Sequence, residues 1–317
     1  MKKLLLLLIL LIGLFLTGCT DVNKESKNDN SGKLSIYTTV YPLQYFTDRI
    51  GGDYVETKTV YPPGADEHTF EPTQKDMMKL AEADLFVYIG LGLEGFVDKA
   101  QKTLENEKVT LLGAGENVHI EPNQTDEDED HEHEHEDDGH HHGDIDPHVW
   151  LDPLYAKDLA EAIMNELTVK MPEHKEEFEA NYQKLAKELE ELNKKFEQTI
   201  HEAKHKEIIV SHSAFGYWEK RFGLQQISVA GLNSSSEPTQ KDLEKIISEG
   251  KKHQVKYVFF EQNVSSKLTE IIQKELGAQP LVLHNLSVLT DEDISDNRTY
   301  LSLMEGNLQA LETALNE

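Results

Sequence analysis

The feature that most constrains the fold is the stretch 172–204, which contains no glycine and has its only proline at the start. Proline is tolerated in the first turn of a helix, so nothing in the stretch interrupts helix formation. Apolar residues recur at alternating intervals of four and three, the period of one helix face. These residues are Phe178, Tyr182, Leu185, Leu189, Leu192 and Phe196. The stretch predicts one helix of about 45 Å, which we interpret as a connector between two globular units rather than as a coiled-coil segment.

Short apolar runs rich in β-branched and aromatic residues lie on both sides of this predicted helix. They alternate with helical patterns, which is typical of parallel strands joined by crossover helices. We therefore predict an α/β protein with two related lobes, each a parallel sheet flanked by helices, joined by one long rigid helix. The strand-like runs are residues 33–46, 54–62, 84–90 and 109–114 in the first lobe and 206–215, 224–231, 256–263 and 279–286 in the second.

The hexapeptide EPTQKD occurs twice, at Glu71–Asp76 and at Glu237–Asp242. In each copy a threonine precedes a helical pattern and an aspartate follows three residues later, the spacing of a capping box. Thr73 and Thr239 are therefore expected to cap one helix in each lobe. Two similar caps can arise by coincidence, but the shared hexapeptide favours a duplicated domain.

The N-terminus has the pattern of an export signal. Two lysines precede an apolar run, Leu4–Leu16, that is too short to cross a bilayer. Two small residues then stand directly before Cys19, the only cysteine of the chain, in an order that fits a lipobox better than a lone buried cysteine. We predict a signal peptide over 1–18, lipidation of Cys19, and a flexible polar tether over 19–32.

The formal net charge of −28 bears on the partners of the chain. Nucleic acid is disfavoured because phosphate binding needs a basic surface, whereas cations are natural ligands of an acidic one. The predicted organisation after the tether is an N-terminal lobe over 33–171, the connecting helix over 172–204 and a C-terminal lobe over 205–317.

An acidic, histidine-rich segment, 121–146, interrupts the first lobe. It holds thirteen acidic residues, six histidines and no lysine or arginine, so it cannot bury a core and is predicted to be a loop. Clustered imidazoles and carboxylates bind Zn²⁺ weakly at several stoichiometries; the alternatives are a solubilising loop or a pH sensor. The histidines are His131, His133, His135, His140, His141 and His142.

Three of the nine histidines outside this segment have unusual surroundings. His68 follows a predicted strand and a Pro-Gly turn, His148 lies between two Asp-Pro pairs, and His212 stands where a buried strand runs out. In open α/β sheets, the carboxyl ends of strands are where ligands bind. Taken alone, each histidine fits a structural role at least as well as a role as metal ligand. Taken together, the three favour a metal site in the cleft between the lobes.

The segments around these histidines resemble those of a known family. They read GADEHTFEPTQKD, DPHVWLDP and SHSAFGYW, and they are similar to the signature segments of the metal-specific solute-binding lipoproteins of ABC transporters, above all the zinc-uptake receptors of the ZnuA and AdcA type. The resemblance covers essentially the whole mature chain. It implies that His68, His148 and His212 bind Zn²⁺. Manganese-selective relatives usually have a carboxylate at the third position, so three imidazoles favour zinc.

The resemblance leaves the fourth ligand open. Some zinc receptors have a glutamate in the segment matching LHNLSVLT, where this chain has Ser287. Glu67, beside His68, or a water molecule could complete the shell. Glu261, at the end of a predicted strand, is a candidate to orient His212.

The implied function is that of an extracytoplasmic Zn²⁺ receptor that is lipid-anchored to the cell membrane. It would act as a monomer, without catalysis, and deliver zinc to an ABC permease driven by a cytoplasmic ATPase. We expect a Gram-positive surface rather than a periplasm. One alternative is a receptor for manganese or another divalent ion. A second is a zinc hydrolase, because three histidines and a water also form a catalytic site, although none of His68, His148 and His212 lies in an HExxH motif. A third is a surface adhesin.

Overall fold

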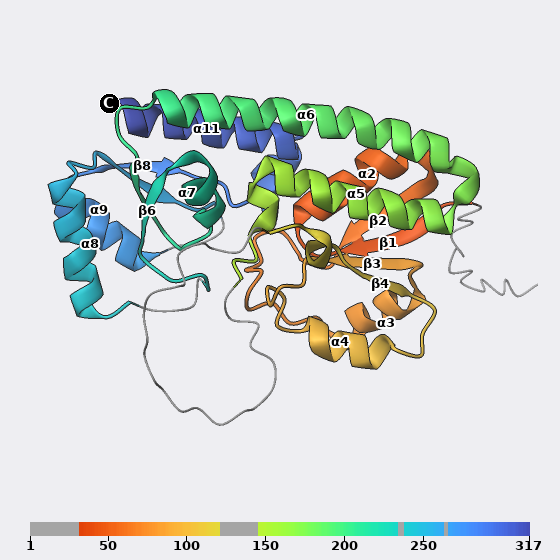
Figure 1. Ribbon diagram of the computed structural model, residues 1–317. Helices are drawn as coiled ribbons and strands as arrows, with labels where there is room; N and C mark the ends of the chain where they lie inside the picture. Colours follow the sequence, from red (N-terminus) through yellow and green to blue (C-terminus); the bar gives the residue numbers. More distant parts are fainter. Residues whose placement is uncertain (1–31, 121–144, 234–237, 263–265) are drawn as a thin grey trace, which may run out of the picture. The chain divides into compact units, whose positions relative to one another are not determined.

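Two sheets of four parallel strands form the centre of the protein (Figure 1). The computed structural model describes residues 32–120, 145–233, 238–262 and 266–317. The strand orders are β2-β1-β3-β4 and β6-β5-β7-β8, so the second sheet repeats the topology of the first. All eight predicted runs contain a strand, and the predicted α/β architecture is confirmed. The strands are β1 (Leu34–Thr38), β2 (Val55–Thr59), β3 (Leu85–Tyr88), β4 (Thr110–Gly113), β5 (Glu207–Val210), β6 (Gln225–Ser228), β7 (Tyr257–Phe260) and β8 (Gln279–Val282).

The predicted strand over 33–46 was wrong in its second half. Strand β1 ends at Thr38, and helix α2 spans Tyr41–Gly51. Proline lies in the first turn of α2, where its missing N–H costs no hydrogen bond. Leu43, Phe46 and Ile50 are fully buried on one helix face. The aromatic and β-branched composition of this segment concealed a helical period.

Helices cover both faces of the first sheet (Figure 1). Helices α2 and α5 (Pro153–Lys170) lie on one face, and α3 (Gln74–Glu82) and α4 (Val97–Leu104) lie on the other. The second sheet is accompanied by α7 (Gly216–Phe222), α8 (Gln240–Lys252) and α9 (Lys267–Leu276). The short helix α10 (Asp291–Ser295) and helix α11 (Tyr300–Asn316) follow β8 and complete the chain.

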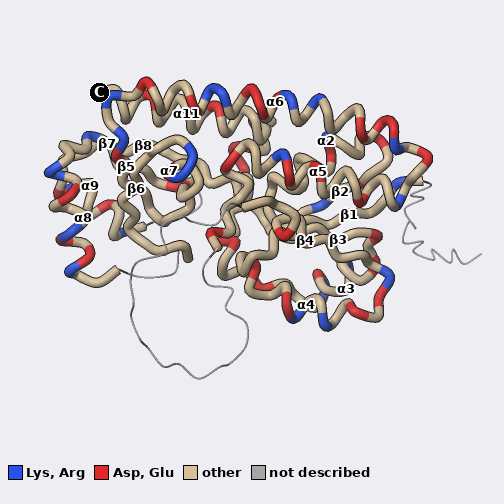
Figure 2. The backbone as a smooth tube through the Cα atoms, viewed as in Figure 1, with Lys and Arg blue, Asp and Glu red and all other residues tan. Residues whose placement is uncertain are grey.

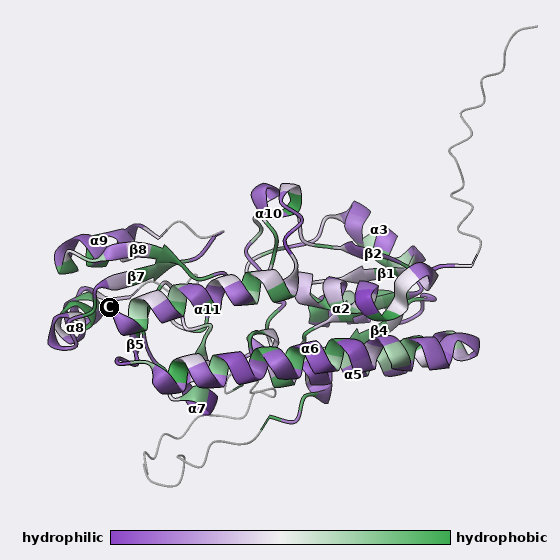
Figure 3. Cartoon of the chain, turned by 90° about the horizontal axis from the view of Figure 1, so that it is seen from above, coloured by the Kyte–Doolittle hydropathy of each residue, from purple (hydrophilic) through white to green (hydrophobic). Residues whose placement is uncertain are grey.

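The predicted connecting helix is α6, Lys175–Glu202, preceded by a 3-10 turn at Pro172–His174. Every residue of the predicted apolar stripe is buried, while acidic and basic residues alternate along the outer side of the helix (Figure 2). Helix α6 packs against α2, α5, α7 and α11, and Figure 3 shows α11 beside it. One continuous hydrophobic core contains residues of both sheets and of α6. This packing stabilises the arrangement of the two sheets against hinge bending.

Several predictions made from the sequence fall outside the described residues: the signal peptide, Cys19 and the six histidines of the acidic segment. The predicted lobe boundaries stay predictions, since the chain from Leu34 to Glu317 forms one compact unit. In the parts of the chain that the structure describes, no helix combines the length and the apolar character that a membrane span requires.

Both copies of the hexapeptide form capping boxes. The side chains of Thr73 and Thr239 each accept a hydrogen bond from the backbone N–H of the aspartate three residues on, and each aspartate carboxylate accepts one from the threonine backbone N–H. We expect Thr73→Ala and Thr239→Ala each to lower the free energy of unfolding by about 1 kcal/mol, measured by urea denaturation. Equal unfolding midpoints for wild type and both variants would refute the role of these caps.

Candidate metal centre

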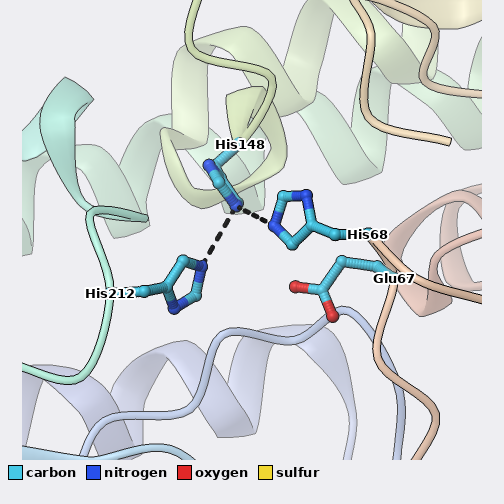
Figure 4. Close-up of side chains that lie close together, drawn as sticks. All are labelled: Glu67, His68, His148 and His212. Carbon is cyan, nitrogen blue, oxygen red and sulfur yellow. Dashed lines mark hydrogen bonds between the residues drawn. The ribbon is translucent and has the colours of Figure 1, made fainter. Parts of the chain in front are cut away.

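Three imidazoles from distant parts of the chain lie close together (Figure 4). His68 lies in the loop between β2 and α3, His148 directly precedes the 3-10 turn Val149–Leu151, and His212 lies two residues beyond β5. The Nε2 atom of His148 is 3.3 Å from Nε2 of His68 and 3.3 Å from Nε2 of His212. The structure therefore brings together all three histidines predicted to bind a metal.

The carboxylate of Glu67 joins the three imidazoles. One ligand atom from each of the four residues lies within 4.8 Å of the others. His148, His212 and Glu67 are buried, and His68 is partly exposed. Among the described residues, no other group of three or more potential ligands is this close together. The carboxylate of Glu67 thus belongs to the same compact group of potential ligands as the three imidazoles.

Two further carboxylates fix the tautomers of His148 and His212. The Nδ1 atom of His148 lies 2.8 Å from Oδ1 of Asp146, and Nδ1 of His212 lies 2.6 Å from Oε1 of Glu261. An ionised carboxylate only accepts hydrogen bonds, so each Nδ1 carries the proton. In the neutral ring the lone pair is then on Nε2, the atom that points to the centre of the group.

Burial and neighbouring charges shift the pKa values of this group in different directions. Burial, assisted by the two nearby imidazoles, lowers the pKa of His68 to about 3. Burial also opposes the charged form of His212, but the charge and hydrogen bond of Glu261 outweigh it and raise the pKa of this histidine above its ordinary value. Burial raises the pKa of Glu67, against the opposing effects of a hydrogen bond from its own backbone and of the histidines.

Local hydrogen bonds hold the loop that carries Glu67 and His68. The hydroxyl of Tyr61 donates to the carbonyl oxygen of Glu67 at 3.1 Å. The side chain of Asp66 accepts hydrogen bonds from the backbone N–H groups of His68 and Thr69, both at 3.0 Å. In this turn the Asp66 side chain bonds the backbone of the residues that follow it. The turn fixes the directions of the Glu67 and His68 side chains.

His212 and Glu261 come from neighbouring strands of the second sheet. Strands β5 and β7 pair directly, and the chain leaves them toward β6 and β8, on opposite sides. The carboxyl ends of such a strand pair form the crevice in which open α/β sheets bind ligands. The direct pairing of β5 with β7 thus explains why His212 and Glu261 are adjacent.

Asp146 is a site residue that the sequence prediction missed. It is buried, and besides the His148 ring it accepts a hydrogen bond from the His148 backbone N–H at 3.0 Å. Tyr217 donates to its carbonyl oxygen, and a Cβ at Gly216 would lie 2.7 Å from its Oδ2. The position two residues before a histidine is the only sequence signal for this role. The segment predicted as a loop over 121–146 therefore ends within the site.

Replacing Asp146 with alanine is expected to weaken Zn²⁺ binding by about 10-fold or more, because the His148 ring loses the partner that orients it. The variant should remain folded, since the backbone bonds of the turn at 149–151 are unaffected. Competition with a zinc chelator measures the change. An affinity equal to that of wild type would exclude an orienting role for Asp146.

Ser287 and His284 are buried polar residues that lie outside the ligand group. The hydroxyl of Ser287 donates a hydrogen bond to Oδ1 of Asn285 at 2.9 Å. Its partner is therefore a side-chain amide and not a member of the ligand group. His284, which the sequence prediction did not single out, lies 3.2 Å from Oδ2 of Asp293 and accepts a hydrogen bond from the Leu286 backbone. It is a structural histidine of the chain between β8 and α10.

Comparison with known proteins agrees with this geometry. Residues 36–314 match the profile of the ZnuA family, described as zinc-uptake complex component A, periplasmic. The chain belongs to the ZnuA family. The description is that of a component of an uptake complex, not of an enzyme class. The match includes all four residues of the ligand group.

Curated members of the ZnuA family are similar over the whole chain. The zinc-binding lipoprotein AdcA of Streptococcus pneumoniae is 36% identical over 317 residues. The high-affinity zinc uptake system protein ZnuA of Bacillus subtilis is 34% identical over 303 residues, which are 95% of this chain and 94% of that protein. The chain spans only 62% of the length of the S. pneumoniae AdcA.

Solved structures of ZnuA-like proteins share the fold. The Zn(II)-bound ZnuA-like domain of S. pneumoniae AdcA superposes with a TM-score of 0.73 at 33% identity, covering 90% of this chain and all of that one. The laminin-binding protein Lmb of Streptococcus agalactiae, described as having adhesin and metal-transporting activity, gives a TM-score of 0.77 at 29% identity, with the same coverage.

Proposed function

We propose that this chain is a Zn²⁺-binding receptor in which His68, His148, His212 and Glu67 hold one ion. The observation that carries the proposal is the spacing of the Nε2 atoms, 3.3 Å in two pairs. Two ligands at about 2.05 Å from a tetrahedral zinc ion are about 3.3 Å apart. The imidazoles thus need little movement to bind zinc.

The donor set supports zinc over manganese. Imidazole nitrogen suits Zn²⁺, whereas manganese prefers sites rich in carboxylate and carbonyl oxygen. A fourth ligand from Glu67 also closes the site, while a zinc hydrolase keeps an open position for water. The function supported best is therefore binding of the ion as cargo, without conversion of a substrate.

Delivery and location are further parts of the proposal. The receptor would be lipidated on Cys19, face the extracytoplasmic side of the cell membrane as a monomer, and pass zinc to an ABC permease with a cytoplasmic ATPase. The lipobox supports the anchor, and the names of the relatives, a zinc-binding lipoprotein and a zinc uptake system protein, support the pathway. The histidines of 121–144 would serve as an auxiliary store of weakly bound ions. The streptococcal and Bacillus relatives favour a Gram-positive surface.

The proposal is tested by calorimetric titration of the purified chain with Zn²⁺ and with Mn²⁺. We expect one tight zinc site, weaker manganese binding, and loss of the tight site when the three histidines are replaced by alanine. Weak zinc sites in the acidic segment should survive that replacement. Tight zinc binding that survives the triple replacement would overturn the proposed site.

Zinc affinity should depend on pH through His212. Zinc binds the neutral imidazole; the lowered pKa of His68 keeps that ring neutral at physiological pH, whereas the raised pKa of His212 favours its charged form. As pH falls through the His212 pKa, which lies above the ordinary 6.5, zinc must displace one proton. Affinity should then fall by about 10-fold per pH unit. Chelator competition over a pH series tests this, and Glu261→Gln should move the fall to lower pH. A flat profile through this range would contradict the assignment.

Adhesion is a second candidate function, favoured by the similarity to Lmb, whose description includes adhesin activity. It predicts that the chain binds immobilised laminin and that this binding persists in the triple histidine variant. Absence of laminin binding by the wild-type chain would remove this candidate while leaving the zinc receptor untouched.

A further inference from the structure

A single buried amide connects the two glutamates of the site. Asn285 is fully buried and lies in the segment between β8 and α10. Its Nδ2 atom is 2.7 Å from Oε2 of Glu261 and 3.2 Å from Oε1 of Glu67. Glu67 is a member of the ligand group, and Glu261 bonds the Nδ1 atom of His212 through its other oxygen. One side chain thus contacts the carboxylate ligand and the residue that orients an imidazole ligand.

The orientation of this amide is determined by its surroundings. Its Oδ1 atom accepts hydrogen bonds from the Ser287 backbone N–H at 3.0 Å, the Ser287 hydroxyl at 2.9 Å and Nε2 of Gln262 at 2.9 Å. A backbone N–H can only donate, so oxygen must be on that side. The two N–H groups therefore face the two carboxylates, and each has one acceptor.

The backbone of Asn285 is held as firmly as its side chain. Its carbonyl oxygen accepts a hydrogen bond from the indole of Trp150 at 2.7 Å, and its N–H donates to Oε1 of Gln262 at 3.1 Å. The backbone N–H of Tyr41 donates to the carbonyl oxygen of Ser287 at 2.9 Å. The amide is thus presented from a segment fixed to the first sheet's helices and to the end of β7.

Two buried carboxylates this close together need a hydrogen-bond donor. Glu67 and Glu261 are only 2% and 6% exposed, so water cannot replace a missing partner at low cost. A neutral amide supplies one donor to each without adding charge. With the amide removed, the Glu67 side chain loses the bond that directs it toward the imidazoles.

We propose that Asn285 is a positioning residue that holds Glu67 as the fourth zinc ligand and steadies Glu261 behind His212. Zinc then meets three nitrogens and one carboxylate oxygen instead of three nitrogens and a water. The inference rests on the proposed zinc-binding function and deepens it, because it states what selects the fourth ligand. Ser287 supports this role, because its backbone N–H and its hydroxyl both donate hydrogen bonds to the amide oxygen of Asn285.

The test uses Co²⁺ as a spectroscopic probe of the full chain, added at half an equivalent so that the tight site fills before the acidic segment. Asn285→Ala should alter the visible Co²⁺ spectrum as a carboxylate ligand is lost, and should weaken Zn²⁺ binding by about 10-fold. Glu67→Gln should give a similar spectrum. In the double variant the combined loss of affinity should be smaller than the sum of the two single losses, because both changes remove the same Glu67 ligand.

Asn307→Ala is the matched control. This second buried asparagine bonds the backbone N–H and the carbonyl oxygen of His284, at 2.7 and 2.8 Å, so it supports the same segment without a bond to either glutamate among the described residues. It should lower thermal stability and leave the Co²⁺ spectrum and the Zn²⁺ affinity as in wild type. A spectral change equal to that of Asn285→Ala would mean that any loosening of the segment disturbs the site.

Three results would overturn the inference: a wild-type spectrum and affinity in Asn285→Ala, additive effects in the double variant, or the spectral change in the control. If Asn285→Ala does not fold, Ser287→Ala takes its place, since it removes one of the donors that lock the amide, and an unchanged spectrum there is the contradicting result. Failure of the proposed function looks different, because the wild-type chain itself would then lack a tight zinc site sensitive to His148→Ala.

Discussion

Replacing His148 with alanine is expected to lower the zinc affinity of the tight site by about 100-fold or more. Zinc sites of the structural type are worth about 10–16 kcal/mol, so one of four ligands accounts for about 3 kcal/mol, which is about 100-fold. His148 is the central ligand, since its Nε2 atom is 3.3 Å from that of each of the other two histidines. It is also fully buried, so water cannot easily take its place without rearrangement. Competition with a chelator of known affinity measures the loss.

His284→Ala is the control for this experiment. It removes a buried imidazole that bonds Asp293 and the Leu286 backbone, so it should reduce stability while zinc affinity stays at the wild-type level. The account of the site is contradicted if His148→Ala binds zinc as wild type does, or if both histidine variants lose affinity equally.

Replacing Asp152 with alanine is expected to lower the free energy of unfolding by about 3 kcal/mol, from the loss of a helix cap and of a largely buried ion pair. Asp152 is fully buried and caps α5, accepting hydrogen bonds from the N–H groups of Leu154 and Tyr155 at 2.9 and 3.1 Å. The same oxygen pairs with the guanidinium of Arg221 on α7. Because Arg221 is 23% exposed, solvent screens part of the cost, and we place the loss at the lower end for a broken buried pair.

This ion pair also joins three helices, since Nη2 of Arg221 donates a hydrogen bond to Oδ1 of Asn193 on α6 at 2.8 Å. Urea denaturation of the metal-free chain measures the loss. Asp146→Ala, from the same DIDPHVWLDP segment, is the comparison: it should unfold close to wild type and bind zinc more weakly. A loss below about 1 kcal/mol in Asp152→Ala would show that the ion pair adds nothing to the cap.

The strands and the long helix were predictable because their signals are local. The stripe from Phe178 to Phe196 is set by helix geometry within one segment, and the helix that it predicted matches α6 to within three residues at each end. In the segment 33–46 the aromatic and β-branched composition favours a strand throughout, whereas a proline in the first turn marks the start of a helix at Tyr41. Local patterns identify elements, and their ends depend on single residues.

The site was only partly predictable, because its supports act across the chain. Each histidine stood out by its own neighbours, and the family resemblance grouped them. Asn285 carried no such signal: it bonds Glu67 across 218 residues of sequence and Glu261 across 24. Such partners become visible only when tertiary structure brings them together, and no local rule pairs an asparagine with two remote glutamates.

The most direct test of the central claim is X-ray absorption at the zinc edge on the purified chain loaded with half an equivalent of Zn²⁺. We predict four nitrogen or oxygen neighbours, with nitrogen at about 2.0–2.1 Å, and scattering from three imidazoles that falls to two in His148→Ala. A six-coordinate oxygen shell, or an imidazole count that His148→Ala leaves unchanged, would contradict the assignment of His68, His148, His212 and Glu67 as the zinc ligands.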